Sequence, residues 1–552
     1  MKNRILSTTP MLLSAIASAA LAGCTNLINQ NTDGNQVYTG VEGEATIATD
    51  DTGGPFDGET SGGTAGTASA DSSDADSSGS DPDAGTSEAA STGGSSGSSG
   101  IPDEDTSEAA STGGSSGSSG PDDGGSEVGD TGGSEDSGDG GGAISPIDGD
   151  PITDKPGEVY AVSLALGWGT TYALLNNGEI KAWGNGNGGA LGYGDELHVV
   201  DPSVVGAIDL GFRAKQVVAG RYFACALAAD GEAEEGCARC WGVDSAGNLG
   251  RGFADVGNPA IGDDEPVSTG PLISLESPIV ALAAGEQHVC ALMADQRATC
   301  WGRGGQGQLG LGNSQNIGDD ELPGAAGAID MDWPVTSMWA GGHMSCLGGE
   351  DGDVVCFGEG QALGNGSLEN IGDDELPKDQ PPLAFGFPIR QLAIGLQHMC
   401  ALGTPEAGSP LECVGFGLYG ALGGGNIANQ FDAAAAVPVS LPFAPRWIDA
   451  MENHTCGSDD DGRTMCFGWG GTGNLGYAST ENVGDDDTPA EWGAVVTGID
   501  VVRVYTGWAH TCVLSSSAQV ECWGSGYLGY PVVWGAIGDD EVPASAGLVP
   551  YL

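Results

Sequence analysis

The chain has 552 residues, of which 99 are glycine, and its 77 acidic side chains outnumber 16 basic ones, giving a formal net charge of −61. We expect no nucleic-acid partner, because nucleic-acid phosphates have to be neutralised by Lys and Arg. The same charge disfavours direct binding to an anionic membrane surface.

The first 24 residues are typical of an export signal. A basic start is followed by an apolar run over 11–22, which is too short to span a bilayer comfortably. Leu21-Ala-Gly-Cys24 resembles the bacterial lipobox, whose cysteine becomes the lipid-bearing first residue. We therefore predict a lipoprotein signal peptide over 1–24, a lipid anchor at Cys24, and an exported protein of the outer membrane or cell surface. Ordinary signal cleavage beside an incidental cysteine is the alternative.

A segment that cannot build a hydrophobic core follows, over residues 25–156. It consists mostly of Ser, Gly, Thr, Asp and Glu, and residues 86–100 are repeated without change as 106–120. Such a composition buries too little apolar surface to offset the entropy of the chain. We predict a disordered acidic linker, a flexible stalk with a root-mean-square span of roughly 60 Å.

From residue 157 to 552 one sequence unit recurs. Gly285-Glu-Gln-His-Val-Cys-Ala-Leu292 returns as Gly395-Leu-Gln-His-Met-Cys-Ala-Leu402. An aromatic-Gly anchor, or a valine in one unit, follows each time at Trp183, Trp241, Trp301, Phe357, Val414, Phe467 and Trp523. These anchors lie 53 to 60 residues apart, and short β-rich runs alternate with glycine turns between them. Because this period is typical of propeller blades, we predict an all-β fold of seven four-stranded blades.

The motifs resemble the repeats of the regulator of chromosome condensation (RCC1) family. The family pattern Gly-x-x-His-Thr-x-x-Leu stands here as Gly507-Trp-Ala-His-Thr-Cys-Val-Leu514, and a second pattern stands as Trp301-Gly-Arg-Gly-Gly-Gln-Gly-Gln-Leu-Gly310. The resemblance covers about 158–552 and implies a seven-bladed β-propeller. A photoreceptor of the family carries Gly-Trp-Arg-His-Thr. Since Gly507-Trp-Ala-His-Thr511 lacks the arginine and the tryptophan cluster of that photoreceptor, we expect no photoreception.

The two ends of the repeat region suggest how the ring closes. The first unit opens directly at Tyr160, without a leading strand, whereas residues 547–552 remain after the last unit. We therefore expect 547–552 to complete the first blade as its outer strand.

Twelve of the 14 cysteines form pairs that bracket one strand-turn-strand within a unit. The pairs are Cys225 with Cys240, Cys290 with Cys300, Cys346 with Cys356, Cys400 with Cys413, Cys456 with Cys466, and Cys512 with Cys522. Cysteines that face each other across a hairpin suit a disulfide, and an exported protein meets an oxidising compartment. The first unit has Tyr172 and Ala182 at these positions. Cys237-Ala-Arg-Cys240 has zinc-site spacing, but Cys240 already has a partner, so we expect no zinc and an unpaired Cys237.

Four histidines precede a paired cysteine by two residues and so share its face of the strand. They are His288, His398, His454 and His510. Neighbouring blades hold them too far apart for one metal ion, so we expect hydrogen bonds in the core. His343 is displaced by one residue from this pattern.

An acidic turn, Ile-Gly-Asp-Asp-Glu, occurs in four units, with Val483-Gly-Asp-Asp-Asp487 as a variant and no counterpart in the fifth. Its adjacent carboxylates are weak candidates for Ca²⁺, at Asp263, Asp264, Asp319, Asp320, Asp373, Asp374, Asp539 and Asp540. The alternative is a turn whose Asp side chains accept hydrogen bonds from the backbone ahead of the following proline. We expect no other metal and no cofactor.

The sequence carries no catalytic signature, since Gly-x-Ser-x-Gly, His-Glu-x-x-His and a phosphate loop are all missing. We therefore predict a non-enzymatic, monomeric interaction module. Its propeller holds an unidentified protein ligand on one face, and it meets the membrane only through the lipid on Cys24. A guanine-nucleotide-exchange regulator, implied by the family resemblance, and a calcium-binding adhesion or inhibitor propeller are the alternatives.

Overall fold

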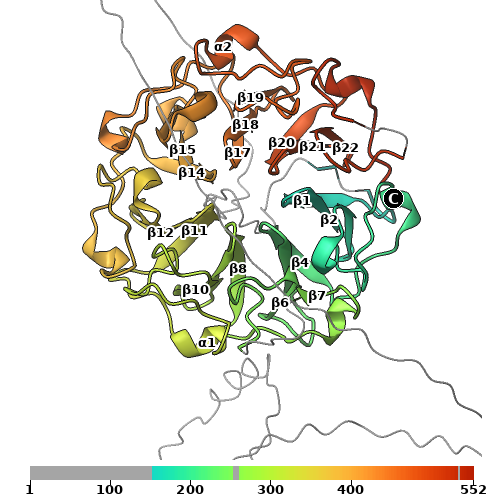
Figure 1. The fold of residues 1–552 in the computed structure, drawn as a ribbon, viewed down its shortest axis with the longest axis vertical. Coiled ribbons are helices and arrows are strands. Elements are labelled where there is room, and N and C mark those ends of the chain that lie inside the picture. The colour runs from blue at the N-terminus through green and yellow to red at the C-terminus, as the bar shows by residue number, and fades with distance from the viewer. Residues whose placement is uncertain (1–151, 154, 253–259, 532–534) are drawn as a thin grey trace, which may run out of the picture. The chain divides into compact units, whose positions relative to one another are not determined.

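The chain folds into a ring of antiparallel sheets. The computed structural model describes residues 152–153, 155–252, 260–531 and 535–552. These residues form seven sheets, six of three strands and one of four, placed one after another around a central channel (Figure 1). The predicted all-β propeller is confirmed. The signal segment 1–24 and the linker up to residue 151 lie outside the described residues.

Each blade contributes an inner, a middle and a third strand in chain order. The inner strands, nearest the channel, are β1 (Ala161–Leu166), β4 (Ala214–Ala219), β8 (Ile279–Ala284), β11 (Val335–Gly341), β14 (Ile389–Ile394), β17 (Trp447–Met451) and β20 (Val501–Thr506). The middle strands are β2 (Thr170–Leu175), β5 (Phe223–Ala228), β9 (His288–Met293), β12 (Met344–Gly349), β15 (His398–Gly403), β18 (His454–Ser458) and β21 (His510–Ser515). The third strands are β3 (Ile180–Gly184), β6 (Ala238–Val243), β10 (Ala298–Gly302), β13 (Val354–Gly358), β16 (Leu411–Gly415), β19 (Thr464–Gly468) and β22 (Val520–Gly524).

The connection after each third strand returns along its outer edge. In blade 3 Gly302 pairs with Ile317, and further on Ile329 N donates to Ala298 O at 2.8 Å. In blade 2 the first of these contacts forms a short fourth strand, β7 (Ala260–Ile261). The blades thus keep only short, mostly covered edges.

Helices are short in this fold. The two α-helices among the described residues, α1 (Pro323–Ala326) and α2 (Pro489–Trp492), are single turns that begin with a proline in the outer connections. Within the same residues we find no helix with the length and apolar character needed to cross a membrane.

The aromatic anchors of the repeat form the core between the blades. β2, β5 and β21 are buried along their whole length, because a neighbouring blade covers each face of the sheet. Trp301 is fully buried, and its indole Nε1 donates to Asn248 O of the preceding blade at 3.1 Å. Trp241 and Trp523 make the same bond to the blade before them. The residues that define the period therefore join successive blades.

The ends of the propeller meet between blades 7 and 1, but not as predicted. Blade 1 has its own inner strand, so the expectation that 547–552 complete this blade is wrong. Val549 N instead donates to Val520 O at 2.9 Å, which places the C-terminal segment along β22 of blade 7. Tyr551 reaches blade 1 with its side chain, whose hydroxyl accepts a hydrogen bond from Ala161 N at 3.1 Å. The reason is that the outer edge of blade 1, along β3, is already occupied by its own connection, in which Val199 pairs with Gly184 and Ile208 N donates to Ile180 O at 2.8 Å.

The last residues of the predicted linker also belong to the propeller. Thr153 N donates to Ser516 O at 2.8 Å, and Lys155 Nζ donates to Ser517 O at 2.7 Å. Both acceptors lie in the hairpin turn of blade 7. The ordered contacts therefore begin a few residues before the predicted boundary at residue 157.

Candidate protein-binding face

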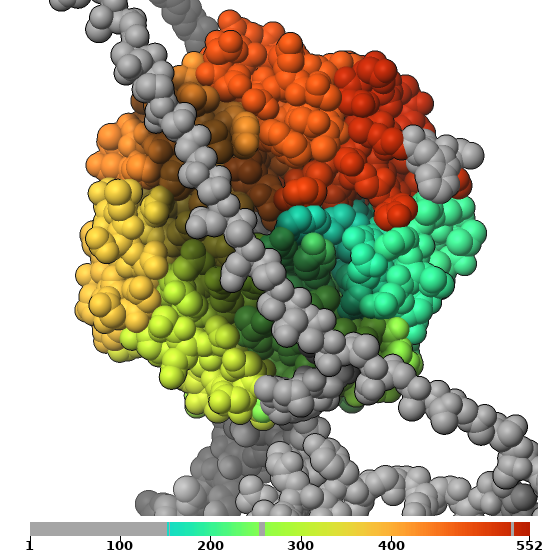
Figure 2. All heavy atoms as spheres, viewed as in Figure 1, coloured from blue at the N-terminus to red at the C-terminus, as the bar shows by residue number. Residues whose placement is uncertain are grey.

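Two sets of loops lie at the same end of every blade. The inner strand runs into a loop of the Gly-x-x-His type, and the third strand ends beside that loop, where a glycine-rich loop begins. In blade 3 Arg303 N donates to Gln287 O across these loops at 2.9 Å. The equivalent donors in the other blades are Asn185, Val243, Glu359, Phe416, Trp469 and Ser525. We call this end of the propeller the loop face, and Figure 2 shows one face of the ring, hollowed toward its centre.

Aromatic side chains from three blades stack where the loop face meets the channel. Trp168 of blade 1 stacks on Trp508 of blade 7 with ring centroids 4.5 Å apart, and the Tyr222 ring of blade 2 lies 5.3 Å from that of Trp168. The guanidinium carbon of Arg221 lies 3.6 Å from the Trp168 ring centroid, within cation–π range. All four side chains are half-buried.

Charged side chains continue this group around the mouth of the channel. Arg221 forms an ion pair with Glu286, and a Glu286 oxygen lies 3.3 Å from His343 Nε2. Glu452 accepts a hydrogen bond from the Trp508 side chain, and burial, together with the charge of Glu286, raises its pKa to about 7. We name the group the mouth cluster; its members are Trp168, Arg221, Tyr222, Glu286, His343, Glu452 and Trp508. They come from six of the seven blades.

The mouth cluster was not among the predicted sites. Folding stacks Trp168 on Trp508, from the first and last blades. His343 is half-buried at the mouth, while Met344 takes the buried position that histidine has in other blades. The one available signal was the position after the loop glycine, which holds large or charged side chains such as Arg221 in most units.

The channel itself has little free space. A cavity of about 60 Å³ is lined by the inner strands of all seven blades, which is room for a few water molecules. Its walls are mostly apolar, but the Asp449 carboxylate accepts hydrogen bonds from Thr506 N at 2.6 Å and Thr506 Oγ1 at 3.0 Å. Burial raises the pKa of Asp449 to about 7.

The four patterned histidines connect neighbouring blades. Each Nε2 hydrogen-bonds a hydroxyl of the next blade: His288 with Ser345 at 2.8 Å, His398 with Thr455 at 2.9 Å, His454 with Thr511 at 3.3 Å and His510 with Thr171 at 3.1 Å. All four rings are buried, and burial lowers their pKa values to about 3 or 4. The predicted core hydrogen bonding is confirmed.

All six predicted cysteine pairs are disulfides in the structure, and each joins the middle and third strands of one blade. The bonds link Cys225 with Cys240, Cys290 with Cys300, Cys346 with Cys356, Cys400 with Cys413, Cys456 with Cys466, and Cys512 with Cys522. The two cysteines of each pair are also register partners in the sheet, as the hairpin argument requires. In blade 1 Tyr172 and Ala182 form the corresponding register pair.

The remaining two cysteines have different outcomes. Cys237 is buried and also bonded, and the described cysteines include no free thiol, so the expectation of an unpaired Cys237 is wrong. Because Cys240 is in a disulfide with Cys225, it is not a zinc ligand. Cys24 lies outside the described residues, so its predicted lipid stays a prediction.

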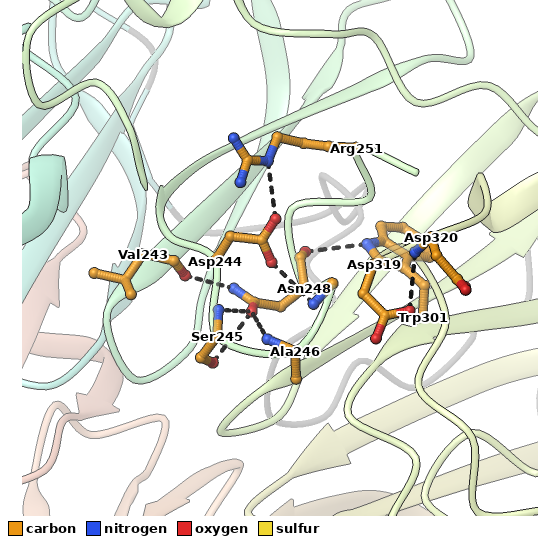
Figure 3. A network of polar contacts seen from close by, with 10 residues as sticks. Val243, Asp244, Ser245, Ala246, Asn248, Arg251, Trp301, Asp319 and Asp320 are labelled. Atoms are coloured by element: carbon orange, nitrogen blue, oxygen red, sulfur yellow. Dashed lines mark hydrogen bonds and ion pairs between the residues drawn. The ribbon is translucent and has the colours of Figure 1, made fainter. Parts of the chain in front are cut away.

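The acidic turns are contacts between blades. Figure 3 shows the glycine-rich loop of blade 2, held by Asn248, against Asp319 and Asp320 of blade 3. Gly252 N donates to Gly318 O at 2.9 Å, and Gly318 has a φ of 97°. A Cβ atom on Gly318 would lie 2.3 Å from the carbonyl oxygen of blade 2 that faces it. Only glycine fits there, which explains why the turn carries one.

The calcium candidates lie in these turns. Each acidic triplet, such as Asp319, Asp320 and Glu321, offers three carboxylate oxygens within 4.8 Å of one another. Asp319 Oδ1 also accepts a hydrogen bond from Asp320 N at 3.0 Å, and Asp539 repeats this bond at 3.1 Å. Three adjacent carboxylates supply only part of the six to eight oxygens that Ca²⁺ requires. The structure therefore gives the turns a role in blade packing, and calcium binding stays a prediction.

Comparison with known proteins agrees with this architecture. Two sequence models of the regulator of chromosome condensation (RCC1) repeat match residues 177–227 and 279–308. The ultraviolet-B receptor UVR8 of Arabidopsis thaliana is 27% identical over 384 residues, which cover 69% of this chain and 80% of that protein. Human E3 ubiquitin-protein ligase HERC2 is 30% identical over 235 residues, 42% of this chain but only 4% of HERC2.

Solved structures share the fold. Human WBSCR16 superposes with a TM-score of 0.52 at 19% identity, over 65% of this chain and 87% of that one. Yeast RCC1 (Prp20), solved bound to Kap60, gives a TM-score of 0.52 at 18% identity, over 72% of this chain and 88% of that one. The two matched segments, the seven sheets and these relatives together show that the chain carries RCC1-type repeats in an RCC1-like propeller fold.

Proposed function

We propose that this protein is a cell-envelope lipoprotein whose disulfide-linked propeller binds a protein partner through its loop face, and that it is not an enzyme. The observation that carries the proposal is the mouth cluster. It presents half-buried Trp, Tyr and Arg side chains, the types that dominate binding energy at protein interfaces, on one face. Loops held by a rigid scaffold are also where propellers and other β-folds place binding residues.

Two further points support a protein ligand. The cavity described among the inner strands has only about 60 Å³ of free space, which does not suit a cofactor-sized molecule at that place. Yeast Prp20p, which has the same fold, has binding properties to Gsp1p and histones. The alternative of guanine-nucleotide exchange has no observation of its own in this chain.

Site-specific photo-crosslinking in intact cells tests the face. The photoreactive residue p-benzoylphenylalanine is placed at Arg303 or Gln361, both exposed on the loop face, and in control variants at Asp351 or Glu406, exposed on the opposite face. We expect a defined protein adduct from the first two positions and none from the controls. Adducts only from the opposite face, or none from either face, would contradict the proposal.

The envelope location rests on the sequence around Cys24 and is supported by the six disulfides, since such bonds persist in oxidising compartments. Cys24→Ser removes the lipid attachment point. We expect this variant to leave the detergent phase in a detergent phase separation, whereas the unmodified protein stays there. Unchanged partition of the variant would contradict the lipoprotein assignment.

A further inference from the structure

One sector of the loop face is apolar, in blade 5. Leu418, Tyr419 and Ile427 have side chains that are 48%, 39% and 61% exposed. They are neighbours, because Gly417 N donates to Asn429 Oδ1 at 3.1 Å and thereby brings the loop before Leu418 against the segment that holds Ile427. We call these three residues the blade 5 patch. Two aromatic rings, Phe416 and Phe431, pack edge to face next to it with centroids 5.5 Å apart.

The same positions are polar or glycine in blades 1, 3 and 6. The Gly-to-Asn or Gly-to-His bond across the loop, found in all three of those blades, aligns them with blade 5. On this alignment Leu418 corresponds to Asn187, Gly305 and Gly471, and Ile427 corresponds to Glu196, Ser314 and Thr480. Blade 4 has the same bond, from Gly360 N to Asn370, and there Ile427 corresponds to Leu368, which is 58% exposed, while Leu418 corresponds to Gln361. Among these aligned blades, exposed apolar side chains at both positions are therefore a feature of blade 5.

Tyr419 is held in an unfavourable backbone conformation. Its φ is 60° and its ψ is 16°, in the left-handed region where blade 1 has Gly188 at a φ of 63°. A bulky residue in this region carries a conformational cost, and such residues cluster at functional sites. A glycine would remove the cost, so a tyrosine at this position is consistent with a use of its side chain beyond the fold.

The surroundings of the patch are acidic. Blade 5 lacks the acidic triplet, but Asn426 N donates to Gly484 O at 3.1 Å, which places Asp485, Asp486 and Asp487 of blade 6 beside the patch. No Lys or Arg occurs between residues 391 and 445 to compensate these carboxylates. An apolar surface beside unpaired negative charge is complementary to a segment that combines apolar side chains with Lys or Arg.

We propose that the blade 5 patch is the docking site for a basic, apolar-rich polypeptide segment of the partner, whose apolar side chains cover Leu418, Tyr419 and Ile427 and whose cations face Asp485 and Asp486. This rests on the proposed function of the loop face. It assigns to blade 5 an apolar anchor of that interface, in addition to the aromatic and charged side chains of the mouth cluster.

The test uses the full chain and a short fluorescein-labelled peptide of Lys, Leu and Tyr, followed by fluorescence anisotropy. Two control peptides replace either Leu and Tyr by Ser or Lys by Glu. We expect binding of the first peptide only, and a loss of at least about tenfold in affinity for Leu418→Ser combined with Ile427→Ser. Asp485→Asn with Asp486→Asn should weaken binding and its salt dependence. The matched control is Leu197→Ser, which removes a 69% exposed leucine from blade 1 and should bind as the unmodified protein does.

Tyr419→Gly separates binding from folding. Because glycine adopts this φ without steric cost, the variant should unfold at a higher temperature than the unmodified protein. It should nevertheless bind the peptide more weakly. If Tyr419 had only a structural role, the variant would bind the peptide as tightly as the unmodified protein does.

Three outcomes overturn the proposal. The first is absence of peptide binding to the unmodified protein, and the second is equal affinity for it and the Leu418→Ser, Ile427→Ser variant. The third is a dimer in sedimentation equilibrium that this variant dissociates, which assigns the patch to a second copy of the chain. If photo-crosslinking at Arg303 still traps a partner in the variant, the loop-face function stands and only the blade 5 anchor is wrong.

Discussion

We call the contact surface between two neighbouring blades a seam, and two of these seams show how the ring is held together. The polypeptide crosses the seam between blades 5 and 6, whereas the seam between blades 7 and 1 joins segments from the two ends of the described residues. At the first seam His398 hydrogen-bonds Thr455 at 2.9 Å, and at the second His510 hydrogen-bonds Thr171 at 3.1 Å. The same histidine–threonine hydrogen bond therefore joins neighbouring blades whether or not the polypeptide crosses the seam.

The two seams differ outside this core. Between blades 5 and 6 the backbone of the acidic turn meets the glycine-rich loop, as in the bond from Asn426 N to Gly484 O. At the closing seam Trp508 stacks on Trp168, and the Tyr551 hydroxyl bridges blade 1 and the hairpin of blade 7. Aromatic side chains therefore supplement backbone contacts where no peptide bond joins the blades, and this contrast can be tested.

Deleting residues 547–552 should have the largest effect, because it breaks the closing seam alone. Val549 and Tyr551 are 4% and 5% exposed, so the deletion removes two buried side chains and bares the edge of β22. We expect a loss of about 5 kcal/mol in the free energy of unfolding. Equilibrium denaturation in guanidinium chloride measures it, and a midpoint equal to that of the full chain would mean that the C-terminus does not hold the ring.

Tyr551→Phe is the matched control for this deletion. It keeps the buried ring and removes the hydroxyl that accepts from Ala161 N and donates to Ala518 O. The expected loss is about 1–3 kcal/mol, because both backbone groups are left without this partner.

The histidines allow the two seams to be compared through pH. In the folded protein burial lowers the pKa of His510 and of His398 to about 4, whereas an unfolded histidine titrates near 6.5. Between these values the unfolded state binds more protons, so each histidine lowers stability as the pH falls. Gln can keep the bond to threonine without titrating. Between about pH 7 and about pH 5, His510→Gln should lose about 2 kcal/mol less stability than the unmodified protein does.

His398→Gln applies the same change to the seam between blades 5 and 6. Because both rings are buried in equivalent surroundings, we expect the same gain at low pH from urea denaturation at each pH. Since the two variants share every carboxylate with the unmodified protein, titration of the acidic turns cancels in the comparison. A pH profile that neither variant changes would mean that these histidines have the same pKa in the folded and the unfolded state.

Much of the fold could be predicted from the sequence because each repeat determines the structure of one blade. The spacing of Trp183, Trp241 and the later anchors follows from one buried ring per blade, and each cysteine pair, such as Cys290 with Cys300, follows from the register of a hairpin. These features depend on contacts within one unit or between adjacent units. The blade count and the disulfide pairs are therefore visible in a single chain.

The closure and the mouth cluster could not be predicted, for physical reasons. A circular array can be divided into blades at several points, so the sequence does not show whether Val549 ends the last blade or begins the first. Trp168, Tyr222 and Trp508 stack only because three blades converge on the channel, and Trp168 and Tyr222 stand in loops without the repeat's histidine. The blade 5 patch stood out in the sequence only as a missing acidic turn.

Removing the hydroxyl partner of the histidine has a smaller expected effect than the deletion of 547–552, and it compares the two seams directly. Thr171→Val at the closing seam and Thr455→Val between blades 5 and 6 each leave one buried histidine Nε2 without its hydroxyl partner. We expect each to cost about 1–3 kcal/mol at neutral pH. Similar losses in the free energy of unfolding, measured by chemical denaturation, would show that this hydrogen bond stabilises both seams equally. A negligible loss for Thr171→Val alone would mean that the aromatic contacts hold the closing seam without the hydrogen bond.

The smallest effect is expected at the N-terminal edge of the propeller, where two contacts tie the end of the linker to blade 7. Lys155→Met removes the bond from Nζ to Ser517 O, and Thr153→Pro removes the N–H that donates to Ser516 O. Thr153 is exposed and Lys155 is half-buried, so water can replace part of each bond. We therefore expect the double variant to lose no more than about 1 kcal/mol. Hydrogen exchange is the more sensitive measurement, and it should show faster exchange in the 515–519 hairpin with no change in the hairpin of blade 5. A loss as large as that caused by deleting 547–552 would mean that the N-terminal and C-terminal edges of the propeller stabilise the closing seam equally.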